Sequence, residues 1–455
     1  MDIMKRGNEK EFSFIQEKVV SRRKHRIKRF MFSVATTLIL AVIFGFVARI
    51  VFIKSDSIVF QLLGLDELKR QQILFPSNGP DDTGASAGLT PTPNPTISVA
   101  PTVTEKPEGE PNKVDEKPKP TIIEQKIDAT IKDLQTIYGD IKQLAGTLRN
   151  SLTTITAVES GVDWFNDEYE KRKSTTGIVI GENNVDVLIL TNLDSVENAD
   201  NIEVEFYGGI TVPGVLWNYD KDYNLAVIAV ELKNIPAEQF ENIKSVDLGE
   251  SYPLAVGDFI LALGSPNGYT GSMEIGMVTS KGSTVYVTDN SLDLFYTDIT
   301  DTPQSSGIIV NISGEVVGII TQSLKEDKDS NISTAIGITK LKPIIDSLAN
   351  KTDRIYFGIQ GMDIPASFLE EESLENGIYV TEVHSNSPAF EAGIYQGDII
   401  TAVNNIKVIS MNGFNKILNS NKVGDKVVIT VQRKSKQVLK EIQLEVILQK
   451  KAIRD

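Results

Sequence analysis

The chain has 455 residues, enough for two or three domains, and its 41% apolar and 24% charged residues are ordinary for a globular protein. It has no cysteine, which excludes disulfides and thiolate chemistry, and only two histidines, His25 and His384, so we predict no metal site and no cofactor. The net charge is −15, yet residues 1–54 carry +8, which leaves −23 for the rest. A region that acidic lacks the basic surface that phosphate binding needs, so nucleic acid is not a predicted partner.

The first predicted element is a transmembrane helix over residues 30–53. Phe30–Ala48 contains nineteen residues without a charge, and a helix needs about 20 apolar residues to cross the hydrocarbon core. The basic run Arg22–Arg29 precedes it, so the positive-inside rule places residues 1–29 in the cytoplasm and the later domains outside the cell. A single-pass protein of the cell membrane is therefore predicted, with a buried core helix as the alternative.

Residues 54–120 are predicted to be a juxtamembrane segment followed by a Pro/Thr-rich disordered linker. Ten of the eighteen prolines fall within residues 76–120, among serine, threonine, glycine and charged residues. Such a composition buries too little apolar surface to offset the entropy of ordering the chain.

A helix is predicted over residues 121–150. Apolar side chains recur there at heptad positions, with Thr130 as a gap: Ile127, Leu134, Ile137, Ile141, Leu144 and Leu148. Two interpretations remain open, an amphipathic helix that lies on the next domain and a self-associating coiled coil.

The remainder of the chain is predicted to be mainly β. Residues 151–348 hold many short strand-like runs separated by Gly, Asn, Asp and Pro turns, which is typical of a barrel or sandwich. Residues 354–448 form a second unit, with strand runs on each side of a short helix signal.

Five blocks in order carry a family resemblance. They are ILTNLDSV (Ile189–Val196), NYDKDYNLAVIAV (Asn218–Val230), Gly257–Ser280, TDITDTPQSSGIIVNISGEVVGI (Thr297–Ile319) and STAIGIT (Ser333–Thr339). Together they resemble the HtrA family of trypsin-like serine proteases, in which a PDZ domain follows the protease domain. The resemblance implies a trypsin-like double β-barrel over residues 151–348 and a PDZ domain over residues 354–448.

The resemblance also implies where a catalytic triad would lie. The position of the general base falls on Asp194, that of the orienting acid on Asn224, and that of the nucleophile on Ser306. A serine hydroxyl is a poor nucleophile until a base takes its proton, and a carboxylate is a much weaker base than imidazole. The glycine that donates an N–H to the oxyanion is replaced by Gln304. We therefore predict a degenerate protease domain in which Ser306 is a relic.

Two other residues of this domain are candidates for a substitute base. Lysine can serve this role, but Lys281 has no spacing that places it beside Ser306. Asp301 is close to Ser306 in sequence, and an exposed turn carboxylate is the favoured interpretation for it.

The PDZ-like unit is predicted to bind peptides. Arg354–Gly361 resembles a carboxylate-binding loop, in which Tyr356 precedes the backbone N–H groups of Phe357, Gly358 and Ile359. Phe414 and Leu418 are the predicted groove walls. His384 is interpreted as a turn cap or a solvated side chain.

The predicted function is that of a membrane-anchored HtrA-like pseudoprotease that binds peptides, protein C-termini or misfolded chains, with a role in envelope protein quality control. We predict a homo- or hetero-oligomer, and the resemblance implies that it is a trimer. One alternative is an active serine endopeptidase that uses Ser306 with an unconventional base or a residue supplied in trans. Another is a signalling or tethering protein that reports to the basic tail.

Overall fold

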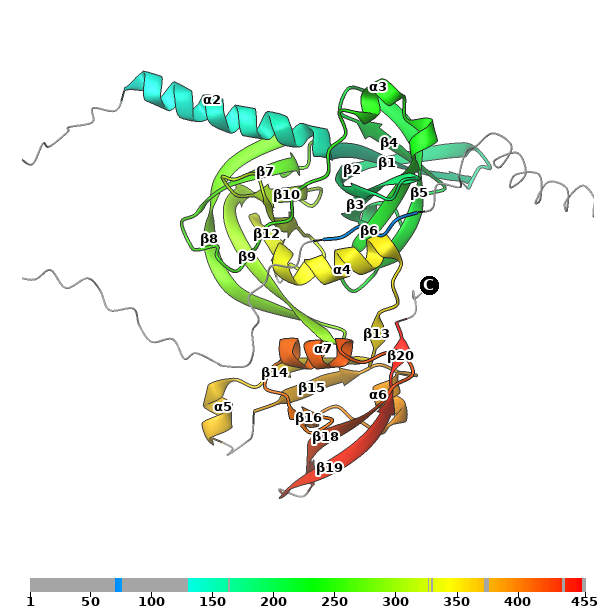
Figure 1. Cartoon of the computed structure of the whole chain (residues 1–455), viewed down its shortest axis with the longest axis vertical. Coiled ribbons are helices and arrows are strands. Elements are labelled where there is room, and N and C mark those ends of the chain that lie inside the picture. Colours follow the sequence, from blue (N-terminus) through cyan, green and yellow to red (C-terminus); the bar gives the residue numbers. More distant parts are fainter. Residues whose placement is uncertain are drawn as a thin grey trace, which may run out of the picture. The chain divides into compact units, whose positions relative to one another are not determined.

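The computed structural model describes residues 70–75, 130–162, 164–325, 327–328, 330–371, 376–435 and 438–451. The predicted cytoplasmic tail, the predicted transmembrane helix and the proline-rich residues 76–120 lie outside the described residues. Within the described ranges, no helix combines the length and the apolar character that crossing a membrane requires. This part of the chain is mainly β, as the sequence predicts: two closed barrels precede a smaller sheet domain (Figure 1).

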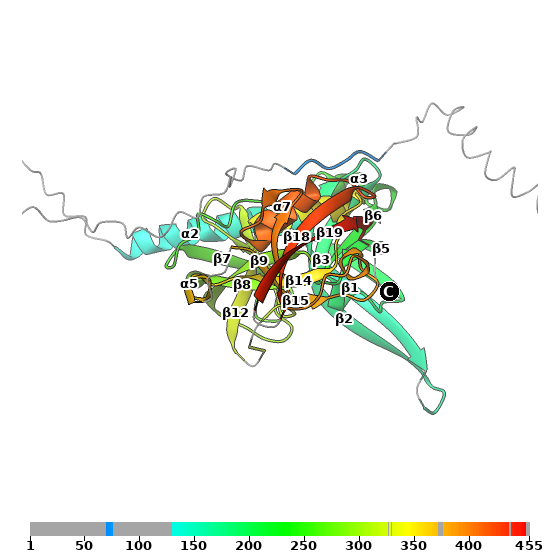
Figure 2. The same ribbon diagram turned by 90° about the horizontal axis from the view of Figure 1, so that it is seen from below.

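Six antiparallel strands close the first barrel in the order β1-β2-β3-β6-β5-β4. They are β1 (Leu152–Val162), β2 (Glu168–Glu182), β3 (Asp186–Asn192), β4 (Asn201–Phe206), β5 (Ile210–Asp220) and β6 (Leu225–Glu231). The apolar runs of β3 and β6 pair with each other and are buried along nearly their whole length. Figure 2 shows β1 and β2 continuing past the barrel as a long hairpin.

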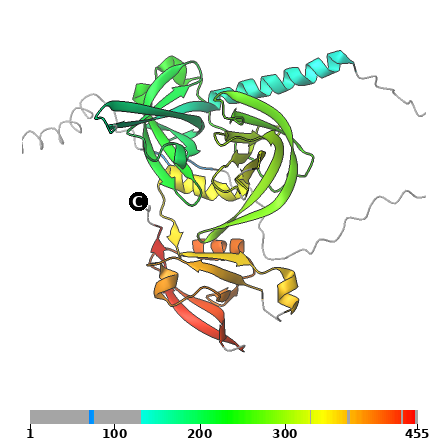
Figure 3. The ribbon, with the colours of Figure 1, turned by 180° about the vertical axis from the view of Figure 1, so that it is seen from behind.

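The second barrel has the strand order β10-β11-β12-β9-β8-β7. Its strands are β7 (Phe259–Ser265), β8 (Ser272–Val287), β9 (Asn290–Thr300), β10 (Ser306–Val310), β11 (Val316–Ile320) and β12 (Ile332–Gly337). A two-residue turn, Thr288 and Asp289, joins β8 to β9. Figures 1 and 3 show this hairpin running from the barrel to the C-terminal domain.

Short helical turns connect the strands, and one longer helix follows the second barrel. The turns are η1 (Arg149–Ser151), η2 (Leu193–Ser195), η3 (Leu232–Asn234) and α3 (Ala237–Phe240). Helix α4 (Ile338–Asn350) packs back onto the first barrel, where Trp217 Nε1 donates a 2.9 Å hydrogen bond to the Ala349 carbonyl. One apolar cluster includes residues of α4 and of both barrels, so α4 fastens the barrels together.

The predicted helix before the barrels is described as α2 (Ile131–Leu148), which begins with a capping box between Thr130 and Asp133. Its last turns pack on the barrels, since Ala145 and Leu148 are buried in the shared cluster. Nearer its N-terminus, Leu134 and Ile137 are 54% and 56% exposed. The helix therefore lies on the next domain only at its C-terminal end, and self-association through the exposed part stays a prediction.

Residues 70–75 lie against the first barrel and α4, a contact that the sequence did not predict. Arg70 Nε is 2.8 Å from a carboxylate oxygen of buried Asp186. The Asn350 side chain at the end of α4 pairs with both backbone polar groups of Ile73, accepting from the N–H and donating to the carbonyl at 2.8 Å each. This short segment thus adds to the packing that holds α4 in place.

The C-terminal domain has its own core and two sheets. β13 (Ile355–Tyr356) pairs with β20 (Gln449–Lys450), and the larger sheet contains β14 (Ile359–Asp363), β15 (Ile378–Val383), β16 (Ile399–Val403), β17 (Ile406–Lys407), β18 (Lys426–Ser435) and β19 (Val438–Ile447). Its helices are α5 (Ala366–Glu371), α6 (Pro388–Glu391) and α7 (Met411–Asn419). Phe357 and Phe414 meet edge to face in the core, with ring centroids 5.2 Å apart.

Candidate functional site

The predicted nucleophile position, Ser306, is the first residue of β10 and is buried between the two barrels. Its Oγ accepts a 3.3 Å hydrogen bond from the Thr175 hydroxyl and a 3.4 Å bond from the Thr176 N–H, both on β2. In the described part of the chain these are its side-chain partners. Neither threonine has a group that can take a proton from serine at neutral pH, so Ser306 stands in an unactivated environment.

The predicted base and acid positions are brought together by hydrogen bonds, none of which involves Ser306. The Asp194 N–H donates to Asn224 Oδ1 at 2.9 Å, and the Leu193 N–H donates to the Asn224 carbonyl at 3.0 Å. The Asp194 carboxylate accepts a 3.2 Å bond from the Ser195 hydroxyl. Asn224 therefore positions the backbone of η2 and orients no side chain toward Ser306.

The turn before Ser306 is held by Ser305, a residue that sequence reasoning missed. Its Oγ accepts from the Thr302 N–H at 2.8 Å and donates to the Pro266 carbonyl at 2.6 Å. Gln304, at the predicted oxyanion-hole position, is exposed on this turn. Its backbone N–H has no acceptor in the described residues, so an N–H is still presented at this position.

Neither candidate for a substitute base is hydrogen-bonded to Ser306. Lys281 Nζ donates to three carbonyl oxygens, those of Ser251, Tyr252 and Leu254. The prediction that Asp301 is an exposed turn carboxylate was wrong. Asp301 is 5% exposed, because it forms a 2.6 Å ion pair with the buried Lys325 ammonium and accepts a 2.7 Å bond from Gln322.

The predicted carboxylate-binding loop presents its backbone N–H groups as a cradle. Phe357, Gly358 and Ile359 all donate to the Asp289 carboxylate, at distances of 2.8 to 3.0 Å. Gly358 has φ +92°, and an added Cβ would lie 2.2 Å from Ser387 Cβ, so this position requires glycine. Burial raises the pKa of the Asp289 carboxyl, while the three N–H donors oppose that rise.

The side chains predicted to shape the peptide groove are fully or almost fully buried. Phe357, Ile359, Phe414 and Leu418 all belong to the core of the C-terminal domain, and Tyr356 on β13 is 7% exposed. Their role in peptide binding stays a prediction.

The interpretation of His384 was wrong, because its side chain neither caps a turn nor lies in solvent. The side chain is 15% exposed, and Nε2 is 3.1 Å from the Thr288 hydroxyl in the β8–β9 turn. His384 therefore contacts the hairpin that carries Asp289.

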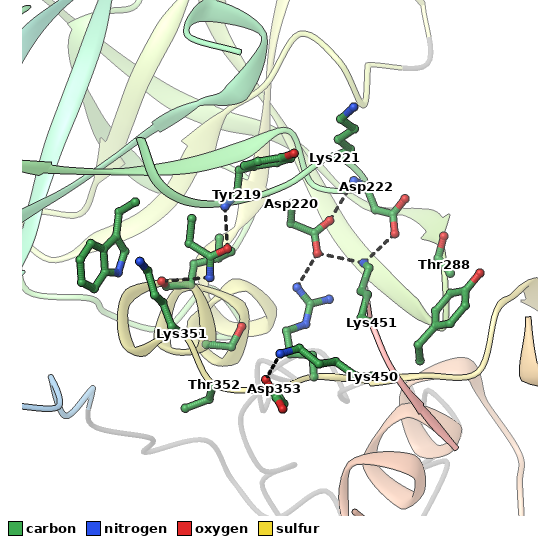
Figure 4. A pocket seen from close by; sticks show the side chains of 16 residues that line it. Tyr219, Asp220, Lys221, Asp222, Thr288, Lys351, Thr352, Asp353, Lys450 and Lys451 are labelled. Atoms are coloured by element: carbon green, nitrogen blue, oxygen red, sulfur yellow. Dashed lines mark hydrogen bonds and ion pairs between the residues drawn. The ribbon is translucent and has the colours of Figure 1, made fainter. Parts of the chain in front are cut away.

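A charged cluster lies beside a cavity of about 300 Å³ where the first barrel, α4 and β20 meet (Figure 4). Arg354 and Lys451 reach the Asp220 carboxylate at 2.5 and 2.9 Å, and Lys451 also contacts Asp222 at 2.6 Å. Burial opposes ionisation of Asp222, but the Lys451 ammonium, together with Thr288 and His384, outweighs it and lowers the pKa of that carboxyl. These ion pairs join both ends of the C-terminal domain to the first barrel.

Comparisons with known proteins agree with this architecture. Residues 175–319 match the trypsin-like peptidase domain family, and residues 364–444 match the PDZ domain family. The serine protease Do-like HtrB of Bacillus subtilis (strain 168) is 31% identical over 280 residues, which cover 57% of this chain and 60% of that protein. The serine protease Do-like HtrA of the same organism is 28% identical over 339 residues, covering 70% of this chain and 73% of that one.

Solved structures give the same result for the fold. The structure titled HtrA-type protease AlgW with decapeptide superposes with a TM-score of 0.53 at 19% identity, covering 69% of this chain and 99% of that one. The chain is therefore HtrA-like, with a trypsin-like peptidase domain followed by a PDZ domain. Its trypsin-like match includes Asp194, Asn224, Gln304 and Ser306, whereas its PDZ match begins after the carboxylate-binding loop.

Within this HtrA-like chain, the functional contacts that sequence reasoning missed come from residues far apart in sequence. Thr175 and Thr176 meet Ser306 across about 130 positions, and Asp289 meets Gly358 across 69. No motif marks either contact. The one local signal is the residue type, since a two-residue hairpin turn with a positive φ favours Asp or Asn, and Asp289 has such a φ.

Proposed function

We propose that this HtrA-like chain is a membrane-anchored pseudoprotease that binds peptides through its PDZ domain. The observation that carries the proposal is the absence of imidazole from both barrels: the histidines of the chain are His25, before the barrels, and His384, in the PDZ domain. The surroundings of Ser306 support it, since Thr175 and Thr176 are its partners there. Without a base, the hydroxyl keeps its proton and the barrels act as a scaffold.

The main alternative is an active serine endopeptidase; the relatives HtrB and HtrA are named as serine proteases. It requires a base that approaches Ser306 Oγ from another copy of the chain or after a rearrangement. The backbone N–H of Gln304, which has no acceptor in the described residues, is compatible with that alternative. The two functions differ in whether Ser306 reacts with an electrophile.

Ser306 is expected to resist a fluorophosphonate probe. The full-length protein and its Ser306→Ala variant should both show background labelling and no casein digestion, because no base lowers the barrier to attack by the hydroxyl. In-gel fluorescence measures the labelling, with trypsin as the positive control. Labelling or digestion that disappears in Ser306→Ala would establish the endopeptidase and overturn the proposal.

The proposed ligands are peptides or protein C-termini that end in a free carboxylate. Two features support this class, namely the three convergent N–H groups of the cradle and the titles of the AlgW structures, which name a decapeptide and a tripeptide. The proposed location is outside the cell membrane, where Phe30–Ala48 would anchor the chain and residues after 54 would meet exported proteins.

The exposed part of α2 is proposed to mediate self-association. Replacing Leu134 and Ile137 by glutamate should lower the oligomer mass measured by analytical ultracentrifugation of the full-length protein, because two charges would enter an apolar heptad seam. The matched control places two glutamates outside the seam, at the exposed positions Gln135 and Gln143. Equal masses for the seam variant and the control would remove α2 from the interface.

A further inference from the structure

The carboxylate cradle of the PDZ domain is filled by a side chain of the same chain. Asp289 Oδ1 accepts from the Gly358 and Ile359 N–H groups at 2.8 and 3.0 Å, and Oδ2 accepts from Phe357 and Gly358 at 2.8 and 2.9 Å. Both carboxylate oxygens are thus saturated by backbone donors. A second carboxylate cannot enter the same space.

The backbone of Asp289 is bound at the same place as its side chain. Its N–H donates to the Ile359 carbonyl at 2.9 Å, which continues the edge of β14. Its own carbonyl accepts a 2.8 Å bond from Asn415 on α7. Earlier on the same hairpin, the Tyr286 hydroxyl accepts from the Asp363 N–H at the far end of β14. The hairpin tip therefore lies along the peptide groove, between β14 and α7.

The residues on both sides of Asp289 in the hairpin turn also hold it in this position. Asp289 has φ +59° and is 6% exposed. Next to it, Thr288 contacts His384, and Asn290 donates to the Tyr223 hydroxyl at 3.0 Å. Figure 3 shows the β8–β9 hairpin arriving at α7 from the second barrel. The carboxylate is thus presented by a braced turn, much as the last residue of a bound peptide presents its own.

We propose that Asp289 is an internal ligand of the PDZ domain, so that a peptide with a free C-terminal carboxylate binds only after the tip of the β8–β9 hairpin has left the groove. The proposal rests on the proposed function, in which this groove binds peptides. The apparent affinity for a peptide is then the intrinsic affinity multiplied by the fraction of molecules whose groove is free of Asp289. If Asp289 only joined the two domains and did not compete with a peptide, its replacement would leave the peptide affinity unchanged.

The test compares the full-length protein with Asp289→Asn. Asparagine accepts the positive φ, so the turn is kept while the carboxylate charge and one acceptor are lost. The probe is a mixture of fluorescein-labelled decapeptides, randomised in their last four positions and ending in a free carboxylate. The same mixture with amidated C-termini reports binding that does not use the cradle. Fluorescence polarisation gives the affinities.

Asp289→Asn should bind the free-acid mixture about tenfold or more tightly than the unsubstituted protein, with no gain for the amidated mixture. Asp247→Asn is the matched control: it removes one exposed carboxylate outside the PDZ domain and should bind as the unsubstituted protein does. Asp289→Gly removes every side-chain acceptor, and glycine tolerates the positive φ at this position. This variant should bind the free-acid mixture at least as tightly as Asp289→Asn. It replaces Asp289→Asn in the test if asparagine lowers the yield of folded protein.

Hydrogen exchange of peptides covering residues 355–362 provides the second measurement. The amides of Phe357, Gly358 and Ile359 should exchange faster in Asp289→Asn than in Asp247→Asn, because two charged acceptor oxygens are replaced by one neutral oxygen. Equal, measurable peptide affinities for the unsubstituted protein and Asp289→Asn would overturn the internal-ligand proposal and leave the proposed peptide binding intact. If no protein binds the free-acid mixture, peptide binding fails, and the exchange rates alone then decide whether Asp289 occupies the cradle.

Discussion

Replacing Asp301 by asparagine is expected to lower the free energy of unfolding by about 3–5 kcal/mol. The Asp301 and Lys325 side chains are 1% and 4% exposed, and their charged atoms are 2.6 Å apart. Asparagine keeps the shape of the side chain and removes its charge, which leaves the Lys325 ammonium buried without a counter-charge. The ammonium retains neutral acceptors, the Ser330 carbonyl and the new amide oxygen, but these do not offset the loss of water around a cation.

The measurement is chemical denaturation of the full-length protein followed by circular dichroism. The matched control is Glu445→Gln, which removes one partner of the Lys426–Glu445 ion pair at the same distance of 2.6 Å, with both side chains more than half exposed. Exposed pairs are worth about 0.2–1 kcal/mol, so the control should stay close to the unsubstituted protein. Similar small losses for both variants would show that water reaches Lys325.

The fold was predictable because local composition and block order both indicated it. β3 and β6 appear in the sequence as short, almost uninterrupted apolar runs, and the structure pairs them and buries them. The heptad pattern indicated α2, whereas the capping box at its first turn became visible only in the structure. The resemblance of the blocks to the HtrA family then placed Asp194, Asn224 and Ser306 in the trypsin-like domain that the family match covers.

The side-chain partners were not predictable, because each depends on a contact across the folded chain. Asp301 lies among turn-forming residues, which favoured exposure, but its partner Lys325 comes from a loop 24 positions later. His384 meets Thr288 across 96 positions, and Asp289 meets the cradle only because β8 and β9 continue beyond their barrel. The spacing of residues in the sequence carries no information about such long-range side-chain contacts.

Replacing Gly307, next to Ser306, is the second substitution expected to lower the free energy of unfolding strongly, here because of backbone geometry. It has φ +122°, and a Cβ added there would lie 2.2 Å from the Leu263 carbonyl oxygen. Gly307 pairs with Gly264, which also has a positive φ, so β7 and β10 approach more closely than side chains would allow. Strain at such a φ costs about 1–3 kcal/mol, and overpacking adds about 1–3 kcal/mol more.

The Gly307→Ala variant should therefore lose on the order of 2–6 kcal/mol of unfolding free energy, measured by denaturation of the full-length protein. Gly271→Ala separates the two causes, because Gly271 has φ +76° but no atom within 4 Å of an added Cβ. That control should cost about 1–2 kcal/mol, the backbone part alone. A loss at Gly307 no larger than the loss at Gly271 would mean that β7 moves away from β10. The turn that carries Ser305 and leads into Ser306 would then be free to adopt another geometry, and the fluorophosphonate experiment would need repeating on that variant.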